Sequence, residues 1–548
     1  MFVRTQKSGK RTYLLIVENE WIDGKVKQKV LHRLGRLDVL QQSGQLDGLM
    51  LSMQRFSEKL AVLGACENGQ VETTATRKIG PALIFERLWR NVGIGKVLSN
   101  LLAQRRFEFS VERAVFLTVL HRLFYPGSDR AAEKWKLDYQ IKGVDKIELH
   151  QLYRAMGWLG QPLGSKEQAG ATPFAPRCTK DLIEEALFAS RRDMFTSLDL
   201  VFFDTTSIYF EGSGGKTIGQ LGHSKDHRSD LKQMIVGVVL DDQGNPLCSE
   251  MWPGNVTDVK TLVPVVNRLK TRFHVGNVCI VADRGMISVQ TKQEIEKRQW
   301  KYILGVRMRR CKEVKEIVLS RSGRYQEVFA KSDRSKAPAP LKVKEVSVEG
   351  RHYIVCLNED QAVKDRCDRE AIVASLRDAL GQGDKSLIGN KGYRRFVQTQ
   401  GERFIIDEQK LKDETRYDGK WVLTTNTELS AQELALKYKQ LWMVEAIFRS
   451  MKSLLETRPI FHKHDATIRG HVFCSFLALL LCKELQDRLA NKGLALEWAD
   501  VIRELDSLVE MDLSVRGKQY TIRGQASTTV AQVFSACGVA LPPVLRQN

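Results

Sequence analysis

The stretch SLDLVFFDTTSIYF, residues 197–210, runs from apolar residues into a polar turn at Asp204. Its apolar half is typical of a buried β-strand. A second stretch, NVCIVADRGM at 277–286, has the same form and places Asp283 after an apolar strand. Ligands of α/β proteins bind at the ends of such strands, where a buried carboxylate is costly unless it is paired or binds a cation. The two stretches predict an α/β fold with an acidic site at one end of its sheet.

The residues around these two stretches predict the rest of that sheet. Two strands joined by a DDQGNP turn are expected within 233–255, helices at 258–273 and 288–299, and a further strand at 301–307. The first three strands are close in sequence, which favours antiparallel pairing. Helices separate the later strands, which favours parallel pairing.

The sequence pattern changes after Arg307. Alternating residues on both sides of Glu349-Gly350 predict a hairpin. We expect residues 308–426 to form a mainly β insertion outside the catalytic sheet, and residues 427–490 to return to the catalytic domain. The segment 430–455 has a strongly helical pattern and carries Glu445.

The flanking regions complete the predicted domain organisation. Residues 1–160 combine an early β-hairpin with mostly helical sequence, and residues 161–195 are expected to be a linker and lead-in because their first part is rich in Gly, Pro and small residues. The first part of the catalytic domain is expected at 196–307. Residues 491–548 are expected to form a helical C-terminal region with a role in dimerisation.

Composition narrows the class of protein. The chain has 548 residues, a formal charge of +20 and a hydrophobic fraction of 43%, which exclude a disordered chain and a disulfide-stapled mini-protein. The ten cysteines form no CxxC pair, and the longest apolar run, 472–482, is too short for a bilayer. We expect a soluble, cytoplasmic protein, and its basic surplus suggests a polyanionic partner, most often nucleic acid.

Asp204, Asp283 and Glu445 are the candidate catalytic and metal-binding residues. Three such carboxylates can hold two Mg²⁺ about 4 Å apart, the arrangement used for in-line attack on phosphodiesters. The alternative for each Asp is that it only caps the following turn. Tyr438, Glu445 and Lys452 are seven residues apart and share a helix face with Arg449. Other side chains of this helix are expected in the core, namely Trp442, Val444, Phe448 and Met451.

Three blocks, FFDTTS (202–207), VADRGM (281–286) and YKQLWMVEAIFRSMK (438–452), resemble the signature blocks of bacterial insertion-sequence transposases of the DDE class. The branch with a β-rich insertion has a last block of the form Tyr-x2-Arg-x3-Glu-x6-Lys, and here Leu441 stands at the Arg position. The resemblance implies an RNase H-like fold, binding of terminal inverted repeats, and strand cleavage and transfer with two Mg²⁺ or Mn²⁺.

Several further residues are candidate DNA contacts. The segment GHSKDHRSDLKQ, 222–233, belongs to the resemblance and supplies basic side chains close in sequence to Asp204; its alternative is a solvated loop. His223 and His227 in this segment lack a third ligand nearby, which disfavours zinc. In cut-and-paste relatives a Trp at the place of Trp421 stacks on a flipped-out base, whereas the alternative is a core Trp. The candidate DNA contacts are Lys225, Arg228, Lys232, Arg284, Trp421, Tyr438, Arg449 and Lys452.

The leading interpretation is a transposase that acts as a homodimer on double-stranded DNA at the bacterial nucleoid. One alternative is a metal-dependent nuclease that never joins strands, and another is a non-catalytic DNA-binding derivative. The candidate dimer contact is the segment of C-terminal helices from Val472 to about Val509, whose apolar stripe runs from Val472 to Leu481. Its alternative, which we favour for the part nearest Glu445, is packing against the core of its own chain.

Overall fold

The computed structural model describes residues 1–22, 25–53, 56, 71–168, 171–172, 175–191, 200–274, 278–328, 341–382, 395–400, 403–515 and 517–548. The chain divides into two compact units. The smaller unit comprises Met1–Pro81, Asp138–Gln140 and Glu497–Asn548, and the larger comprises Ala82–Leu137 and Ile141–Leu496. The expected boundary at residue 160 differs from this division, because the helices after Pro81 belong to the larger unit.

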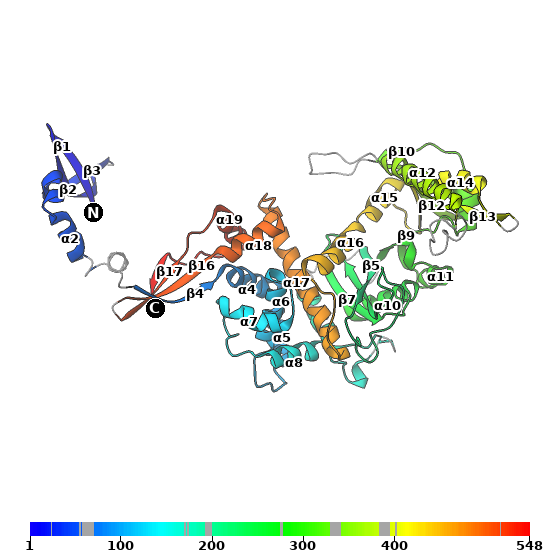
Figure 1. Cartoon of the computed structure of the whole chain (residues 1–548), viewed down its shortest axis with the longest axis horizontal. Coiled ribbons are helices and arrows are strands. Elements are labelled where there is room, and N and C mark those ends of the chain that lie inside the picture. Colours follow the sequence, from blue (N-terminus) through cyan, green and yellow to red (C-terminus); the bar gives the residue numbers. More distant parts are fainter. Residues whose placement is uncertain are drawn as a thin grey trace. The chain divides into compact units, whose positions relative to one another are not determined.

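A nine-stranded sheet forms the centre of the larger unit (Figure 1). Its strand order is β10-β11-β12-β15-β9-β8-β5-β6-β7. The strands are β5 (Leu200–Tyr209), β6 (Gln233–Leu240), β7 (Pro246–Pro253), β8 (Cys279–Ala282), β9 (Lys301–Gly305), β10 (Gln326–Val328), β11 (Leu341–Val348), β12 (Arg351–Leu357) and β15 (Lys420–Thr425).

The pairing of the first five of these strands confirms the sequence prediction. β5, β6 and β7 are antiparallel neighbours, whereas β8 is parallel to β5 and β9 is parallel to β8. All eight residues of β6 are buried, as in a strand covered on both faces. Helices α10 (Leu262–Phe273) and α11 (Val289–Lys297) stand where the sequence predicts them.

The prediction that the insertion lies outside the catalytic sheet is wrong. β15 pairs with β9, with Leu423 opposite Gly305, and β12, β11 and β10 follow in turn. The strands of the insertion therefore extend the catalytic sheet and satisfy the backbone groups that β9 would otherwise expose at an edge. The insertion also has a small apolar core of its own, built around residues such as Val318, Tyr353 and Val422.

The insertion contains more helix than its sequence pattern suggested. Within the expected mainly β insertion, the long helix α12 spans Glu359–Gly381. Its remaining described elements are the π-helical turn η5 (Val314–Val318), the hairpin β13 (Val397–Gln400) and β14 (Arg403–Ile406), α14 (Glu408–Glu414) and η7 (Thr415–Tyr417).

Helices pack beside this sheet, and the long helix α17 (Asp465–Asn491) is central among them. It contacts α6, α8 and β7 (Figure 1). The stripe proposed for dimer contact, Val472 to Leu481, is buried within its own chain, which confirms the alternative interpretation. The other helices are α4 (Gly80–Val92), α5 (Ile94–Leu102), α6 (Val111–Phe124), α7 (Asp129–Trp135), α8 (Leu149–Leu159), α9 (Thr179–Arg191), α15 (Ala431–Lys439) and α16 (Trp442–Arg449).

Among the described helices, α17 is the one that is long and apolar enough to cross a membrane by length and composition. However, 78% of its most apolar window is buried inside the protein. This burial is that of a core helix in a soluble protein.

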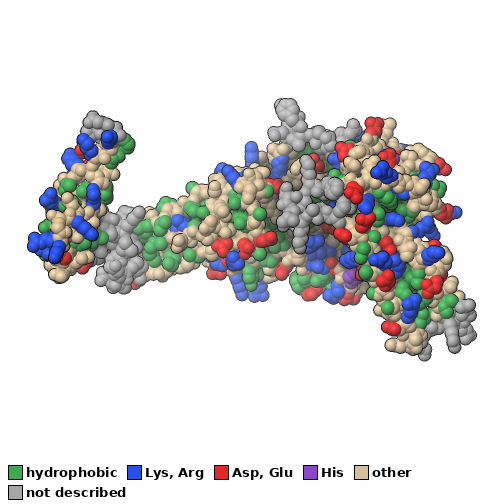
Figure 2. Space-filling model, turned by 90° about the horizontal axis from the view of Figure 1, so that it is seen from above, with side chains coloured by type: hydrophobic (Ala, Val, Ile, Leu, Met, Phe, Trp, Pro, Cys, Tyr) green, Lys and Arg blue, Asp and Glu red, His purple; other side chains and the backbone are tan. Residues whose placement is uncertain are grey.

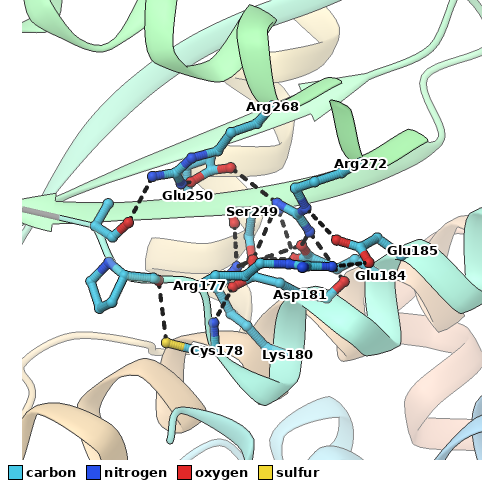
Figure 3. Close-up of polar contacts among 12 residues, drawn as sticks. Arg177, Cys178, Lys180, Asp181, Glu184, Glu185, Ser249, Glu250, Arg268 and Arg272 are labelled. Carbon is cyan, nitrogen blue, oxygen red and sulfur yellow. Dashed lines mark hydrogen bonds and ion pairs between the residues drawn. The ribbon is translucent and has the colours of Figure 1, made fainter. Parts of the chain in front are cut away.

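A buried ion-pair network joins α9, β7 and α10 (Figure 3). At its centre Arg272 contacts Asp181 at 3.2 Å, Glu184 at 3.0 Å and Glu250 at 3.3 Å, and its side chain is only 4% exposed. Lys180 lies 2.9 Å from Asp181, and Arg268 pairs with Glu250. Because each charge faces an opposite one, the network can be buried without a net charge and fixes α9 against the sheet.

The smaller unit contains two antiparallel sheets. The first, β1 (Phe2–Ser8), β2 (Arg11–Ile22) and β3 (Lys25–Arg36), confirms the predicted hairpin and adds β1 as a third strand. Two helices follow it, α1 (Leu37–Gln42) and α2 (Gln45–Met53).

The second sheet corrects the prediction of a helical C-terminal region. Its order is β18-β17-β16-β4, with β4 (Val71–Lys78), β16 (Val509–Val515), β17 (Lys518–Arg523) and β18 (Leu545–Gln547). α18 (Trp498–Ser507) and α19 (Thr528–Cys537) are the helices of this region. The segments 509–515 and 518–523 alternate apolar and polar residues, a strand pattern that the sequence analysis overlooked.

We expect Arg272→Met to destabilise the larger unit by about 3–5 kcal/mol, because the variant leaves several buried carboxylates without their shared cation. Arg377→Met is the matched control, since Arg377 is 64% exposed and 3.9 Å from Glu408; its effect should stay below about 1 kcal/mol. Urea denaturation followed by tryptophan fluorescence measures both. Equal effects of the two variants would contradict a structural role for the network.

Candidate active site

The register between β5 and β8 brings two acidic residues together. Phe203 is opposite Ala282 in this parallel pair, and the next residues along the two strands are Asp204 and Asp283. The sequence suggested that the strand ends at Asp204, but β5 continues to Tyr209 beside β6. Only the pairing of β5 with β8 stops at Phe203. The acidic pair therefore stands where the two strands separate.

Backbone groups hold both carboxylates. The amide of Thr205 donates to Asp204 Oδ1 at 2.7 Å. The amide of Gly285 donates to Asp283 Oδ2 at 3.3 Å, so Asp283 caps the short turn η4 (Arg284–Met286) as well as facing the site.

The environment of Asp204 is poor in positive charge. The pKa of Asp204 is raised to about 6, mainly by burial and in part by the nearby carboxylates of Asp283 and Asp258, whereas Lys225 opposes the shift. Lys225 Nζ lies 4.0 Å from Asp204 Oδ1. A cation bound here would relieve the repulsion between the carboxylates, so these residues fit a divalent metal ion.

Glu445 shares a pocket with Asp283. The pocket has a volume of about 240 Å³. Its lining residues are Asp283, Leu341, Asn358, Trp421, Tyr438, Lys439, Leu441, Trp442 and Glu445. The predicted long helix is present as successive segments, α15, α16 and the π-helical turn η8 (Ser450–Leu454), with Glu445 exposed on α16.

Tyr438 is tied to the acidic pair. Its hydroxyl donates to Asp283 Oδ1 at 3.0 Å, and burial together with the charge of Asp283 raises the pKa of Tyr438 far above its ordinary value. Tyr438 is thus a neutral donor that orients Asp283.

The basic side chains predicted to contact DNA differ in their partners within the protein. Lys225 lies between Asp258, at 3.2 Å, and Thr205. Arg228 pairs with Asp230 at 3.0 Å on the surface, and Lys232 donates to the carbonyl of Ser213 at 3.2 Å.

The remaining basic candidates fall into two groups. Arg284 and Arg449 are exposed. Lys452, on η8, is only 14% exposed and pairs with Asp226 at 2.8 Å. The structure therefore places Lys452 in an internal ion pair, although its spacing in sequence put it on the face of Tyr438 and Glu445.

Two tryptophans line the pocket. Trp421 on β15 is half-buried, and its indole Nε1 has no hydrogen-bond partner within the described part of the chain. Trp442 was expected in the core but is 59% exposed. Val444, Phe448 and Met451, from the same helix, are buried as predicted.

Asp258 is a site residue that sequence reasoning missed. It opens the turn η3 (Asp258–Lys260) just after β7, and it accepts a hydrogen bond from Thr205 Oγ1 at 2.8 Å. Its position in the sequence was the available signal, because Asp258, like Asp283, comes shortly after an apolar strand of the same sheet.

A second group of potential metal ligands lies elsewhere in the larger unit. Asp129, His462 and His471 bring their ligand atoms within 4.8 Å of one another. However, Arg122 Nη2 lies 2.7 Å from His471 Nδ1, and His471 Nε2 donates to the carbonyl of Thr457 at 3.1 Å. A guanidinium in this place repels a cation, so the group is better explained as a buried polar network.

Comparison with known proteins identifies the family. Residues 196–481, more than half of the 548-residue chain, match the transposase DDE domain. The chain belongs to the DDE transposases. Residues 2–67 match the N-terminal domain of IS1634 family transposases. The predicted resemblance to insertion-sequence transposases is therefore confirmed.

Solved structures include one similar to this transposase. It is the piggyBac transposase synaptic complex with hairpin DNA, determined by cryo-EM, with a TM-score of 0.38 and 12% identity. The match covers 78% of this chain and 79% of the other. Among curated proteins, no sequence matches this chain.

The buried histidines predict a pH dependence of stability. Burial, together with the positive charge of Arg122, lowers the pKa of His462 to about 4. An unfolded histidine titrates near 6.5, so the unfolded chain binds more protons between pH 6.5 and 4. Stability should fall as pH decreases through this window, by about 2 kcal/mol between pH 7.5 and 5 for His462 alone.

The measurement compares wild type with His462→Gln by urea denaturation at pH 7.5 and 5. The variant should lose less stability on acidification, because Gln does not titrate. Identical losses in the two proteins would contradict the assignment of this effect to His462.

Proposed function

We propose that this transposase binds the terminal inverted repeats of its insertion sequence, cleaves the DNA strands there, and joins the freed 3′-OH to target DNA. Asp204, Asp283 and Glu445 are the proposed catalytic residues. The observation that carries the proposal is the β5–β8 register, since it sets two carboxylates side by side in surroundings that favour a cation. Glu445 supports it by lining one pocket with Asp283.

These three residues would hold two Mg²⁺, with Mn²⁺ as a substitute. When bound, the ions lower the pKa of a coordinated water and neutralise charge that develops on the phosphate. The chain contributes orientation: Thr205 fixes Asp204, and Tyr438 and Gly285 fix Asp283. No side-chain general base is required in this scheme.

The catalytic sheet supports an RNase H-like assignment. Three antiparallel strands, β7-β6-β5, continue into two parallel ones, β8 and β9. That order matches the one expected for the family. The first catalytic part at 196–307, the insertion at 308–426 and the second part at 427–490 remain the proposed functional divisions, together with the lead-in at 161–195.

Contacts with DNA are proposed on two parts of the chain. Near the acids, the exposed side chains of Arg284 and Arg449 are available to a DNA strand, with Arg228, Lys225 and Lys232 beside them. Trp421, half-buried in the pocket, is the candidate for stacking on a base. In the smaller unit, basic side chains predominate on the β1–β3 sheet (Figure 2). They are Arg4, Lys7, Lys10, Arg11, Lys25, Lys27, Lys29, Arg33 and Arg36, against Glu18 and Glu20.

We assign end recognition to the N-terminal region because of this charge and the match to a transposase N-terminal domain. The active form is proposed to be a homodimer on DNA in the bacterial cytoplasm, since both element ends must be held together. Strand-transfer products in vitro separate this function from that of a nuclease. Terminal inverted repeats in the DNA beside the gene would supply the substrate.

Each of the changes Asp204→Asn, Asp283→Asn and Glu445→Gln should reduce the rate of strand cleavage by about 10³-fold or more. The reason is that a bound metal ion lowers the activation barrier by several kcal/mol, and loss of one of its ligands removes that effect. Binding to terminal-repeat DNA should stay within about threefold, since it rests on basic contacts. The control is Asp242→Asn, an exposed acid in the β6–β7 turn. EDTA should abolish cleavage and Mg²⁺ should restore it. A variant that keeps normal cleavage removes its residue from the triad.

Tyr438→Phe should lower the cleavage rate by about 10–100-fold at saturating protein, because it removes a hydrogen bond to a charged carboxylate worth about 1.5–3 kcal/mol. Single-turnover cleavage and fluorescence anisotropy separate this effect from DNA affinity. Tyr125→Phe serves as the control, since Tyr125 is 63% exposed. If the variant lost only DNA affinity, Tyr438 would be a DNA contact and not an orienting donor.

A further inference from the structure

Asp226 lies in the loop between β5 and β6 and is nearly enclosed by two cations. Its Oδ1 accepts from Lys452 Nζ at 2.8 Å, and its Oδ2 is 2.7 Å from Arg458 Nη1. The side chain of Asp226 is 10% exposed and that of Lys452 is 14% exposed. Both cations belong to the segment that follows Glu445, so Asp226 ties that segment to the loop.

The neighbouring residue, Lys225, points to the other half of the acidic site. Its Nζ donates to the carbonyl of Thr205 at 2.6 Å and lies 3.2 Å from Asp258. Its backbone amide donates to Ser207 Oγ at 2.8 Å, which fixes this part of the loop to β5. Two adjacent residues therefore contact opposite halves of the site.

The loop between these contacts is itself held in one shape. Ser224 is buried, and its Oγ accepts from the amides of Asp226 at 3.2 Å and Arg228 at 3.1 Å. His227 has a positive φ of 58°, a backbone conformation that few residues other than glycine adopt readily. Because this turn is fixed, a displacement of Asp226 also displaces Lys225 and its contacts with β5.

We propose that Asp226 is a positioning residue that couples the two halves of the acidic site. By holding Lys452 and Arg458, it sets the helix of Glu445 relative to the strand of Asp204, through Lys225 and the Ser224 turn. Lys452 then acts as an internal anchor of η8. This inference rests on the proposed function for its catalytic meaning, but the mechanical coupling is a property of the protein alone.

The physical reason is the cost of an unpaired buried charge. If the carboxylate of Asp226 becomes an amide, Lys452 and Arg458 remain close together with no anion between them. The two cations then repel each other, and the least costly response is movement of η8 toward solvent. Such movement displaces Glu445, which lies one to two helical turns before η8.

The test uses the full-length protein without DNA or metal. Hydrogen–deuterium exchange read by mass spectrometry compares wild type with Asp226→Asn and with Asp230→Asn, a matched change at an exposed acid of the same loop. Amides of residues 450–457 should exchange at least tenfold faster in Asp226→Asn and at the wild-type rate in Asp230→Asn. Wild-type exchange in Asp226→Asn would overturn the proposal.

A second pair of variants covers the case in which Asp226→Asn does not fold. Lys452→Met removes the same ion pair from the helix side and should speed exchange over the same residues, whereas Asp226→Glu keeps the charge and should restore most of the protection. Unchanged exchange in Lys452→Met would also overturn the coupling.

Cleavage of terminal-repeat DNA completes the comparison. Asp226→Asn should cleave at least tenfold more slowly than wild type while binding DNA within threefold, and Asp226→Glu should recover much of the rate. Normal cleavage by Asp226→Asn would overturn the positioning role. Glu445→Gln separates the two proposals: if it cleaves normally, the assigned chemistry is wrong, whereas the exchange result still decides the coupling.

Discussion

The parallel pairing of β5 with β8 is the constraint on which the site depends. Two aspartates that are far apart in sequence become neighbours because the strands that precede them share a register. Burial of its carboxyl group is the main cause that raises the pKa of Asp204 to about 6, and repulsion from Asp283 adds to it. The fold must therefore hold the pair against its own repulsion, and the buried apolar strand residues on each side supply that stability.

Two groups of charged residues beside the sheet differ in their balance of charge. In the network around Arg272 the positive and negative charges balance, so it stabilises the packing of α9 and α10 against β7 and needs no bound ion. The acidic site has three nearby carboxylates, those of Asp204, Asp283 and Asp258, with Lys225 as the cation beside Asp204 and Asp258. The contrast between a satisfied network and an unbalanced one distinguishes a structural cluster from a binding site.

The sequence alone predicted the strands β5 to β9 and the direction of their pairing, because hydrophobic runs and the length of the connections between strands indicate both. It did not predict that β15 joins β9, since alternation of residues shows that a segment is a strand but not which edge it meets. Similarly, Asp258 was missed because its partner Lys225 is remote in sequence. The ion pair between Lys452 and Asp226 was also missed, because helical spacing shows nothing of a partner in a distant loop. Trp442 was misplaced because its apolar type suggested burial, whereas it lies off the helix face that Leu441, Val444 and Phe448 bury.

In the four-stranded sheet of the smaller unit, β4 (residues 71–78) pairs with β16 (residues 509–515). A ribosome adds about 5–20 residues per second, so β4 waits roughly 20–90 s for its partner strand during synthesis. By contrast, the β1–β3 sheet has all its strands within the first 36 residues and can form as soon as they emerge. A polypeptide released early by a premature stop would keep the basic N-terminal sheet but lack the β16–β18 strands. Completion of this sheet therefore requires that translation has passed β18, residues 545–547.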